Sequence, residues 1–429
     1  MKRLVFLIFL LSCIQLSAQK LSKAEKKVIQ AVEQNNESAI AFLEKVVNIN
    51  SGTMNHPGVK EVGMVFKAEY EQIGMETSWI DLKEVDRSGH LFAETKGSKG
   101  KRVLLIGHLD TVFPKDSPFQ KLEKRDDGLW HGPGANDMKG GDVIMLYALK
   151  ALYEAGQLSD GQVIVALTGD EEMTGKPLTI SRKHLIEAAK RSDIALGFET
   201  STGFNNATIA RRGSSGWKVE VTGKRAHSSA IFRESIGAGA IFETGRILNA
   251  FYEEVRGEEY LTFNPGIILG GTEINYDEPM NKGTAFGKTN VVAQTVVVDG
   301  GLRFISEEQK ANARAKMREI VADNLPQTSA TISFVDSYPA MGPTAGNQAL
   351  LEKFSKVSVD LGQGPVTAWD PGKRGAADVS FVAQYVDCMD GLGTMGTGAH
   401  TPGETVDLAT IEDLTKRAAI LIYRLINDK

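Results

Sequence analysis

Histidine and acidic residues directly follow three apolar runs of the chain. The runs that begin at residues 103, 163 and 194 lead into His108-Leu109-Asp110, Asp170-Glu171-Glu172 and Glu199. Short apolar runs of this kind are typical of buried strands, and ligands of open α/β sheets bind beyond the carboxyl ends of the strands. We therefore expect three separate strands to deliver imidazole and carboxylate groups to one edge of a sheet.

Two glycine-rich segments add further candidates for the same edge. Residues 132–141 carry Asp137 just before a predicted helix, and residues 391–400 end on His400. Imidazole combined with carboxylate, without a thiolate, is a ligand set for zinc or a similar divalent ion. The two segments thus extend the predicted cluster into a candidate metal site.

The number of candidate ligands indicates two metal ions rather than one. The candidates are His108, Asp137, Glu172, Glu199 and His400. Their three carboxylates carry three negative charges, whereas two divalent ions carry four positive charges. A bridging hydroxide would neutralise the one positive charge that remains. One bridging carboxylate with two further ligands for each ion leaves both ions open to water or substrate, as in hydrolytic sites with metals about 3.5–4 Å apart.

Two acidic residues beside these ligands remain for other roles. Glu171 is the spare carboxylate of its pair, and it is placed to take a proton from the attacking water as a general base. Asp110 follows His108 by two residues and is placed to hold the imidazole in one tautomer. Alternatively, Glu171 and Glu172 form a solvated turn, and Asp110 only caps a strand end.

The surrounding sequence predicts an α/β fold with a mostly parallel sheet and helices on both faces. Predicted helices at residues 22–48, 58–73, 142–155 and 180–189 alternate with the apolar strands. From about residue 213 the order of elements changes to β-α-β-β-α-β, which is the ferredoxin-like α+β arrangement. We therefore predict a catalytic domain over residues 19–212 and 326–429, with a smaller domain over residues 213–325 inserted into it.

The ordered motifs resemble a di-zinc metallopeptidase family that includes glutamate carboxypeptidase, aminoacylase, acetylornithine deacetylase and succinyl-diaminopimelate desuccinylase. They are His108-x-Asp110, Gly134-x-x-Asp137-Met138-Lys139-Gly140, Glu171-Glu172, Glu199 and His400. The resemblance is closest to bacterial glutamate carboxypeptidase. It implies two zinc ions bridged by Asp137, one held with His108 and Glu199 and the other with Glu172 and His400. It also implies Glu171 as the general base and a cis peptide after Asp137.

The resemblance extends to the inserted domain, which in this family acts as a lid and mediates dimerisation. His227 in Ala226-His227-Ser228 matches a histidine that stabilises the oxyanion, often across the dimer. Asn290 resembles an asparagine that contacts the substrate carboxylate, although the proline expected after it is replaced. Arg374 lies where the family keeps an arginine in a glycine-rich turn, and bidentate binding of a carboxylate is the physical expectation for it. The resemblance thus implies a homodimer.

Composition and charge narrow the class of protein further. The chain has 429 residues and a net charge of −5, which argues against nucleic-acid binding because that needs a concentrated basic face. A charged start, an apolar run over residues 4–11 and Leu16-Ser17-Ala18 predict a signal peptide over residues 1–18 and export to the periplasm or beyond. The competing interpretation is a lipidated Cys13, which would attach the protein to a membrane. Cys388 is the only other cysteine.

The sequence therefore predicts an exported di-zinc hydrolase that cleaves a C-terminal amide. The favoured activity is a carboxypeptidase of glutamate-carboxypeptidase type, acting on peptides or N-acyl amino acids through a metal-bridged hydroxide. An N-acyl amino acid deacylase or dipeptidase would use the same residues. A non-catalytic metal-binding protein is the alternative from another class, and the intact Glu171 with five intact ligand types argues against it.

Overall fold

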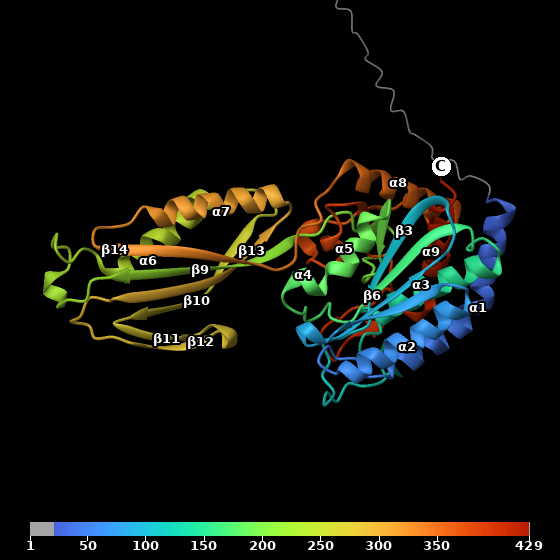
Figure 1. The fold of residues 1–429 in the computed structure, drawn as a ribbon, viewed down its shortest axis with the longest axis horizontal. Helices are drawn as coiled ribbons and strands as arrows, with labels where there is room; N and C mark the ends of the chain where they lie inside the picture. Colours follow the sequence, from blue (N-terminus) through green and yellow to red (C-terminus); the bar gives the residue numbers. More distant parts are fainter. Residues whose placement is uncertain (1–20, 429) are drawn as a thin grey trace, which may run out of the picture.

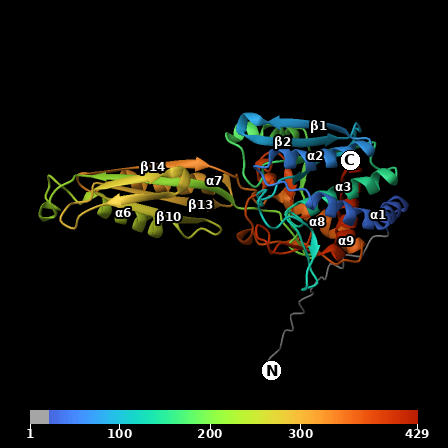
Figure 2. The ribbon, with the colours of Figure 1, turned by 90° about the horizontal axis from the view of Figure 1, so that it is seen from below.

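The computed structural model describes residues 21–428, and they form two lobes that lie end to end along the long axis of the molecule (Figure 1, Figure 2). The predicted signal peptide and the alternative lipidation site at Cys13 lie outside the described residues. No helix within residues 21–428 combines the length and apolar character needed to cross a membrane.

The first lobe contains a six-stranded sheet in the order β1-β2-β6-β3-β7-β16. The bounds are β1 Glu76–Leu82, β2 Arg87–Glu94, β3 Lys99–His108, β6 Gly161–Thr168, β7 Ile194–Gly197 and β16 Asp387–Met389. The last four of these strands are parallel, whereas β1 and β2 pair antiparallel at one side. In the register of the sheet His108 lies opposite Thr168, so the segments after β3 and β6 begin side by side.

Helices cover both faces of this sheet, as the continuous apolar runs of β3 and β6 require, because successive side chains of a strand point to opposite faces. Val103 and Leu105 of β3 join a core with α1, α2, α3, α8 and α9, whereas Leu104 and Ile106 join a second core with α5 (Figure 1). The bounds are α1 Lys23–Val47, α2 His56–Gln72, α3 Lys139–Glu154, α4 Leu178–Ser181, α5 Lys183–Lys190, α8 Ala345–Asp360 and α9 Ile411–Leu425. Two small sheets complete the lobe, with strands β4 Glu123–Lys124, β5 Trp130–His131, β17 Thr405–Val406, β8 Asn206–Ala207 and β15 Thr367–Ala368.

The second lobe is an antiparallel sheet in the order β10-β13-β9-β14, packed against two helices. Its elements are β9 Gly213–Gly223, α6 Gly239–Ala250, β10 Thr262–Gly271, β13 Thr295–Phe304, α7 Glu307–Ala322 and β14 Thr328–Asp336, with a hairpin of β11 Glu273–Asp277 and β12 Lys282–Phe286. Both the mostly parallel sheet and the ferredoxin-like order confirm the predicted fold class. The predicted boundary at residue 325 is wrong, however, because β14 pairs with β9 along its whole length and so belongs to the second lobe.

A buried ion triad holds the carboxyl end of β6 in place. The guanidinium of Arg182 donates to the carboxylates of Asp170 and Asp378, and all three side chains are almost fully buried. Asp170 directly precedes Glu171, while Asp378 comes from a loop more than 200 residues further along the chain. The triad therefore joins two distant segments immediately behind the predicted metal site.

Replacing Arg182 with Met should lower the free energy of unfolding by about 3–5 kcal/mol, because two buried carboxylates would lose their shared partner. Urea unfolding followed by circular dichroism measures this loss. The matched control is Arg191→Met, which removes an exposed ion pair with Glu94 and should cost about 1 kcal/mol or less. Equal losses in the two variants would contradict a special role for the triad.

Candidate metal centre

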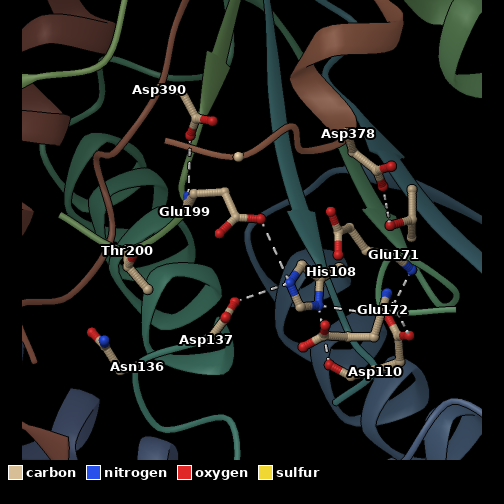
Figure 3. Close-up of polar contacts among 12 residues, drawn as sticks. His108, Asp110, Asn136, Asp137, Glu171, Glu172, Glu199, Thr200, Asp378 and Asp390 are labelled. Atoms are coloured by element: carbon tan, nitrogen blue, oxygen red, sulfur yellow. Dashed lines mark hydrogen bonds and ion pairs between the residues drawn. The ribbon is translucent and has the colours of Figure 1, made fainter. Parts of the chain in front are cut away.

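The predicted ligands come from five different segments that converge on the carboxyl edge of the parallel sheet. Figure 3 shows four of them, His108, Asp137, Glu172 and Glu199. His108 is the last residue of β3, and the other four lie in the segments after β6 and β7, before α3 and between β16 and β17. They form two overlapping groups whose potential ligand atoms lie within 4.8 Å of one another. One group is His108, Asp137 and Glu199, and the other is Asp137, Glu172 and His400.

Asp137 is the residue that the two groups share, and its two carboxylate oxygens face in different directions. Oδ1 lies 3.4 Å from Nε2 of His108, and Oδ2 lies 3.1 Å from Nε2 of His400. The same His400 nitrogen lies 3.1 Å from Glu172 Oε2, and the His108 nitrogen lies 3.6 Å from Glu199 Oε1. A carboxylate placed between two ligand groups in this way is suited to bridge two cations. The peptide bond after Asp137 is cis, as the resemblance implied.

His108 provides a test of whether a cation fits this site. Its Nδ1 lies 3.0 Å from the backbone carbonyl of Asp110, which can only accept, so Nδ1 carries the hydrogen. Nε2 then presents a lone pair to the carboxylates of Asp137 and Glu199, and it is buried without a hydrogen-bond partner. A buried lone pair facing two carboxylates is unfavourable unless a positive charge lies between them. The donor set therefore fits a divalent metal ion.

The carboxylate of Asp110 lies 3.5 Å from Nδ1 of His108, and it has further partners in the neighbouring segments. The backbone carbonyl sets the His108 tautomer, and the carboxylate oxygens accept from the backbone N–H groups of Glu171 and Glu172 at 3.0 and 3.2 Å. The hydroxyl of Thr53 also donates to this carboxylate, at 2.6 Å. Asp110 is fully buried, so it joins three segments of the chain around the metal ligands rather than only orienting the imidazole.

Glu171 differs from its neighbours because its carboxylate has no hydrogen-bond partner among residues 21–428. Its backbone is held instead, with the N–H bonded to Asp110 and the carbonyl accepting from the hydroxyl of Tyr338 at 2.6 Å. Burial, followed by the nearby charges of Glu199 and other carboxylates, raises the pKa of Glu171 well above its usual range. A fixed but unpaired carboxylate beside the candidate ligands is placed to accept a proton, and its raised pKa increases its affinity for that proton.

Glu404 supports the site although the sequence analysis did not single it out. Its fully buried carboxylate accepts from the backbone N–H groups of Gly134, Asn136 and Asp137 at 3.1, 2.8 and 3.0 Å. It therefore joins the loop of Asp137 to the loop of His400. The only hint in the sequence is its position four residues after His400, since a buried glutamate that accepts from backbone groups has no motif of its own.

A glycine allows α3 to start close to the metal ligands. An added Cβ at Gly141 would lie 1.9 Å from the carbonyl oxygen of Phe198, the residue before Glu199. Any larger residue at this position would force the first turn of α3, which follows Asp137, away from the end of β7. The close approach explains why a glycine stands at the third position of α3.

Arg374 lies at the site, beside the Glu199 group. Its guanidinium donates to the hydroxyl and the carbonyl oxygen of Thr200, at 3.0 and 2.8 Å. Its Nε is buried without a partner, and burial followed by the charge of Arg211 lowers the pKa of Arg374 to about 10. The structure thus places one predicted substrate-binding residue next to the metal ligands.

The structure does not bring His227 and Asn290 to the metal ligands of their own chain. The two residues are neighbours, because the N–H of Ser228 donates to the carbonyl of Asn290 at 2.9 Å. β9 leaves the first lobe at Gly213, and His227 follows its far end by four residues. A strand of this length extends about 30 Å, and Figure 1 shows β9 running away from the first lobe. Both residues therefore lie beyond the end of β9 that is distant from the metal ligands.

Comparisons with known proteins find peptidases and related hydrolases that are similar to this chain. The model of peptidase family M20/M25/M40 matches residues 104–426. Carboxypeptidase G2 from Pseudomonas sp. (strain RS-16) is 26% identical over 407 residues, covering 94% of this chain and 93% of that protein. Succinyl-diaminopimelate desuccinylase from Gluconobacter oxydans (strain 621H) is 27% identical over 363 residues, covering 81% and 87%. The Bacillus subtilis YXEP protein, a dinuclear metal binding peptidase, shares the fold with a TM-score of 0.62 at 14% identity, covering 92% of this chain and 99% of that one.

Replacing Glu404 with Gln should weaken metal binding by about 10- to 100-fold, the range typical of residues that orient metal ligands. The amide keeps only one acceptor oxygen, so its NH2 group would face at least one backbone N–H group that needs an acceptor, and the loop of Asp137 would be held less firmly. Competition with a fluorescent chelator measures the affinity. Glu123→Gln, at an exposed glutamate of β4, is the control and should bind metal as the unmodified protein does. Unchanged affinity in Glu404→Gln would contradict the assigned role.

Proposed function

The chain is a metallopeptidase of peptidase family M20/M25/M40, and we propose that it is a carboxypeptidase that cleaves C-terminal amide bonds of peptides or N-acyl amino acids. The observation that carries this proposal is the pair of ligand groups that share Asp137, with the unpaired Glu171 beside them. The similarity to carboxypeptidase G2 over 94% of the chain supports the choice of substrate. The predicted signal peptide supports export as part of the same proposal.

We propose two zinc ions per chain as the metal complement. His108 and Glu199 would hold one ion, Glu172 and His400 the other, and Asp137 would contact both. Bound divalent ions would polarise the amide carbonyl and make a water acidic enough to attack at neutral pH. The mixed imidazole and carboxylate ligands are those that zinc accepts in hydrolytic sites.

The protein residues around the ligands supply positioning and proton transfer. Glu171 takes the proton of the attacking water and delivers it to the amide nitrogen as the C–N bond breaks. Asp110 and Tyr338 hold its backbone while the carboxylate stays free to receive the proton. Arg374, beside Glu199, would bind the C-terminal carboxylate of the substrate and so set which amide lies at the metals.

An N-acyl amino acid deacylase is the second candidate. The similarity to succinyl-diaminopimelate desuccinylase over 81% of the chain favours it. Its reaction also hydrolyses an amide next to a carboxylate-bearing residue, so the same ligands and the same general base would serve. The two activities differ only in the group on the acyl side of the bond.

A panel of dipeptides and N-acyl amino acids, with zinc present, tests this proposal and separates the two candidates. Activity should disappear with a chelator and return with zinc, and metal analysis should find about two ions per chain. Glu171→Gln should keep both ions and lose about 100- to 10,000-fold in kcat, whereas Glu172→Gln should lose metal. Full activity without metal, or two bound ions and a normal rate in both variants, would refute the proposal.

We also propose that the active form is a homodimer in which His227 of one chain completes the site of the other. His227 is exposed, and it lies beyond the end of β9 that points away from the metal ligands of its own chain. Exposed apolar side chains gather near it, with Phe232 and Phe242 in ring contact at 5.5 Å and Ile241 on the same helix as Phe242. Such a patch, next to the edge strand β10, is suited to pairing with a second copy.

His227→Ala should lower kcat with little change in metal content, because the oxyanion would lose a donor. Co-expressing His227→Ala with Glu171→Gln chains should restore part of the activity, since one site of each heterodimer would be whole. His184→Ala, at a histidine of α5 in the first lobe, is the control and should leave kcat unchanged. A fully active monomer in light scattering would refute the cross-chain arrangement.

A further inference from the structure

An open cavity of about 510 Å³ lies directly beside the metal ligand Glu172. Most of its lining is apolar, and the main lining residues are Met54, Val112, Pro114, Lys115, Glu172 and Met173. These residues come from three segments, at residues 52–55, 111–115 and 172–173. The cavity is therefore continuous with the metal site rather than separate from it.

The cavity is lined by exposed apolar side chains whose exposure the packing of the fold does not explain. Among the described residues, the first lobe has six exposed large apolar side chains, and three of them line this cavity. Met54, Val112 and Met173 are 51%, 37% and 54% exposed. Apolar side chains that gather in this way on a surface indicate binding, and the flexible thioethers of the two methionines can adapt to groups of different shape.

The walls of the cavity are held in place before any ligand binds. The carboxylate of Asp110 accepts from the hydroxyl of Thr53 and from the N–H groups of Glu171 and Glu172, so it joins all three lining segments. The backbone of Thr53 and that of Thr111 are also bonded, at 3.1 Å. Because the walls are fixed by the residue that also positions the metal ligands, a group bound here is held at a fixed place relative to the reacting bond.

The position of Arg374 sets which part of the substrate faces the cavity. Arg374 contacts Thr200, and Figure 3 shows Thr200 and Glu199 on one side of His108 with Glu172 and Asp110 on the other. A substrate whose carboxylate binds Arg374 therefore directs its acyl side across the metal ligands towards Glu172. We propose that this cavity binds the acyl side of the scissile amide and selects a large apolar group there, aromatic or branched aliphatic; the proposal rests on the proposed function.

Substrates that share one C-terminal residue and differ only in the acyl group provide the test. The zinc-loaded protein is given the N-benzoyl and the N-acetyl derivative of the same amino acid, for each amino acid of the panel above. The rates for the two derivatives are then compared. The benzoyl compound should have a kcat/KM at least about tenfold higher, because a phenyl ring would be buried in the cavity. Calorimetry on the Glu171→Gln variant, which turns over slowly, should show the same preference in Kd.

Charged substitutions in the cavity should remove this preference. Met54→Glu, and independently Val112→Asp, should bring benzoyl and acetyl compounds within about twofold of each other, mainly by weakening the benzoyl compound. Tyr153→Glu places the same charge at another exposed apolar side chain, at the end of α3, and should keep the preference. Two variants are used so that a folding defect in one of them does not decide the result.

The outcomes separate this proposal from the proposed function. Hydrolysis without a benzoyl preference, or a preference that survives both cavity variants, would overturn the cavity proposal and leave the peptidase activity standing. Absence of hydrolysis across the panel, with tighter binding of the benzoyl compound that Met54→Glu abolishes, would overturn the proposed function and leave the cavity proposal standing. Absence of both would overturn the two together.

Discussion

The mutual repulsion of carboxylates at one edge of the sheet is the constraint on which the rest of the structure depends. Asp137, Glu171, Glu172 and Glu199 converge around the buried imidazole of His108 (Figure 3). Burial and the neighbouring Asp137 raise the pKa of Glu199 to about 7, which shows how costly its negative charge is there. Divalent cations would offset this cost, so the charge that the proposed chemistry needs would also stabilise the arrangement.

Residues outside the ligand set hold this repulsive arrangement together. Asp110 joins three segments through backbone N–H groups and a hydroxyl, and Glu404 joins two loops in the same way. Arg182 forms ion pairs with two further buried carboxylates behind β6. In each case a buried charge meets several fixed donors or acceptors, which is the condition under which a buried charge is tolerated. The same bonds of Asp110 also shape the apolar cavity beside the site.

The second lobe adds a constraint of distance. Its sheet is anchored near the site, where Tyr338 bonds to the backbone of Glu171, and it then extends away from the first lobe. A strand has a fixed rise per residue, so the loop of His227 is held about 30 Å from that anchor. One chain therefore has the candidate metal centre at one end and the surface proposed to pair with a second chain at the other.

The sequence by itself was sufficient to predict the fold class and the convergence of the five candidate ligands, because apolar runs define strands and the residues after them lie at one sheet edge. It also indicated Glu171 as the base. The sequence could not reveal the role of Glu404, the bonds of the Asp110 carboxylate or the extent of the second lobe to Asp336, since each depends on pairing between segments far apart in the chain. It also could not place His227 relative to the metals, because that position depends on how rigidly β9 extends from the first lobe, which only the tertiary structure decided.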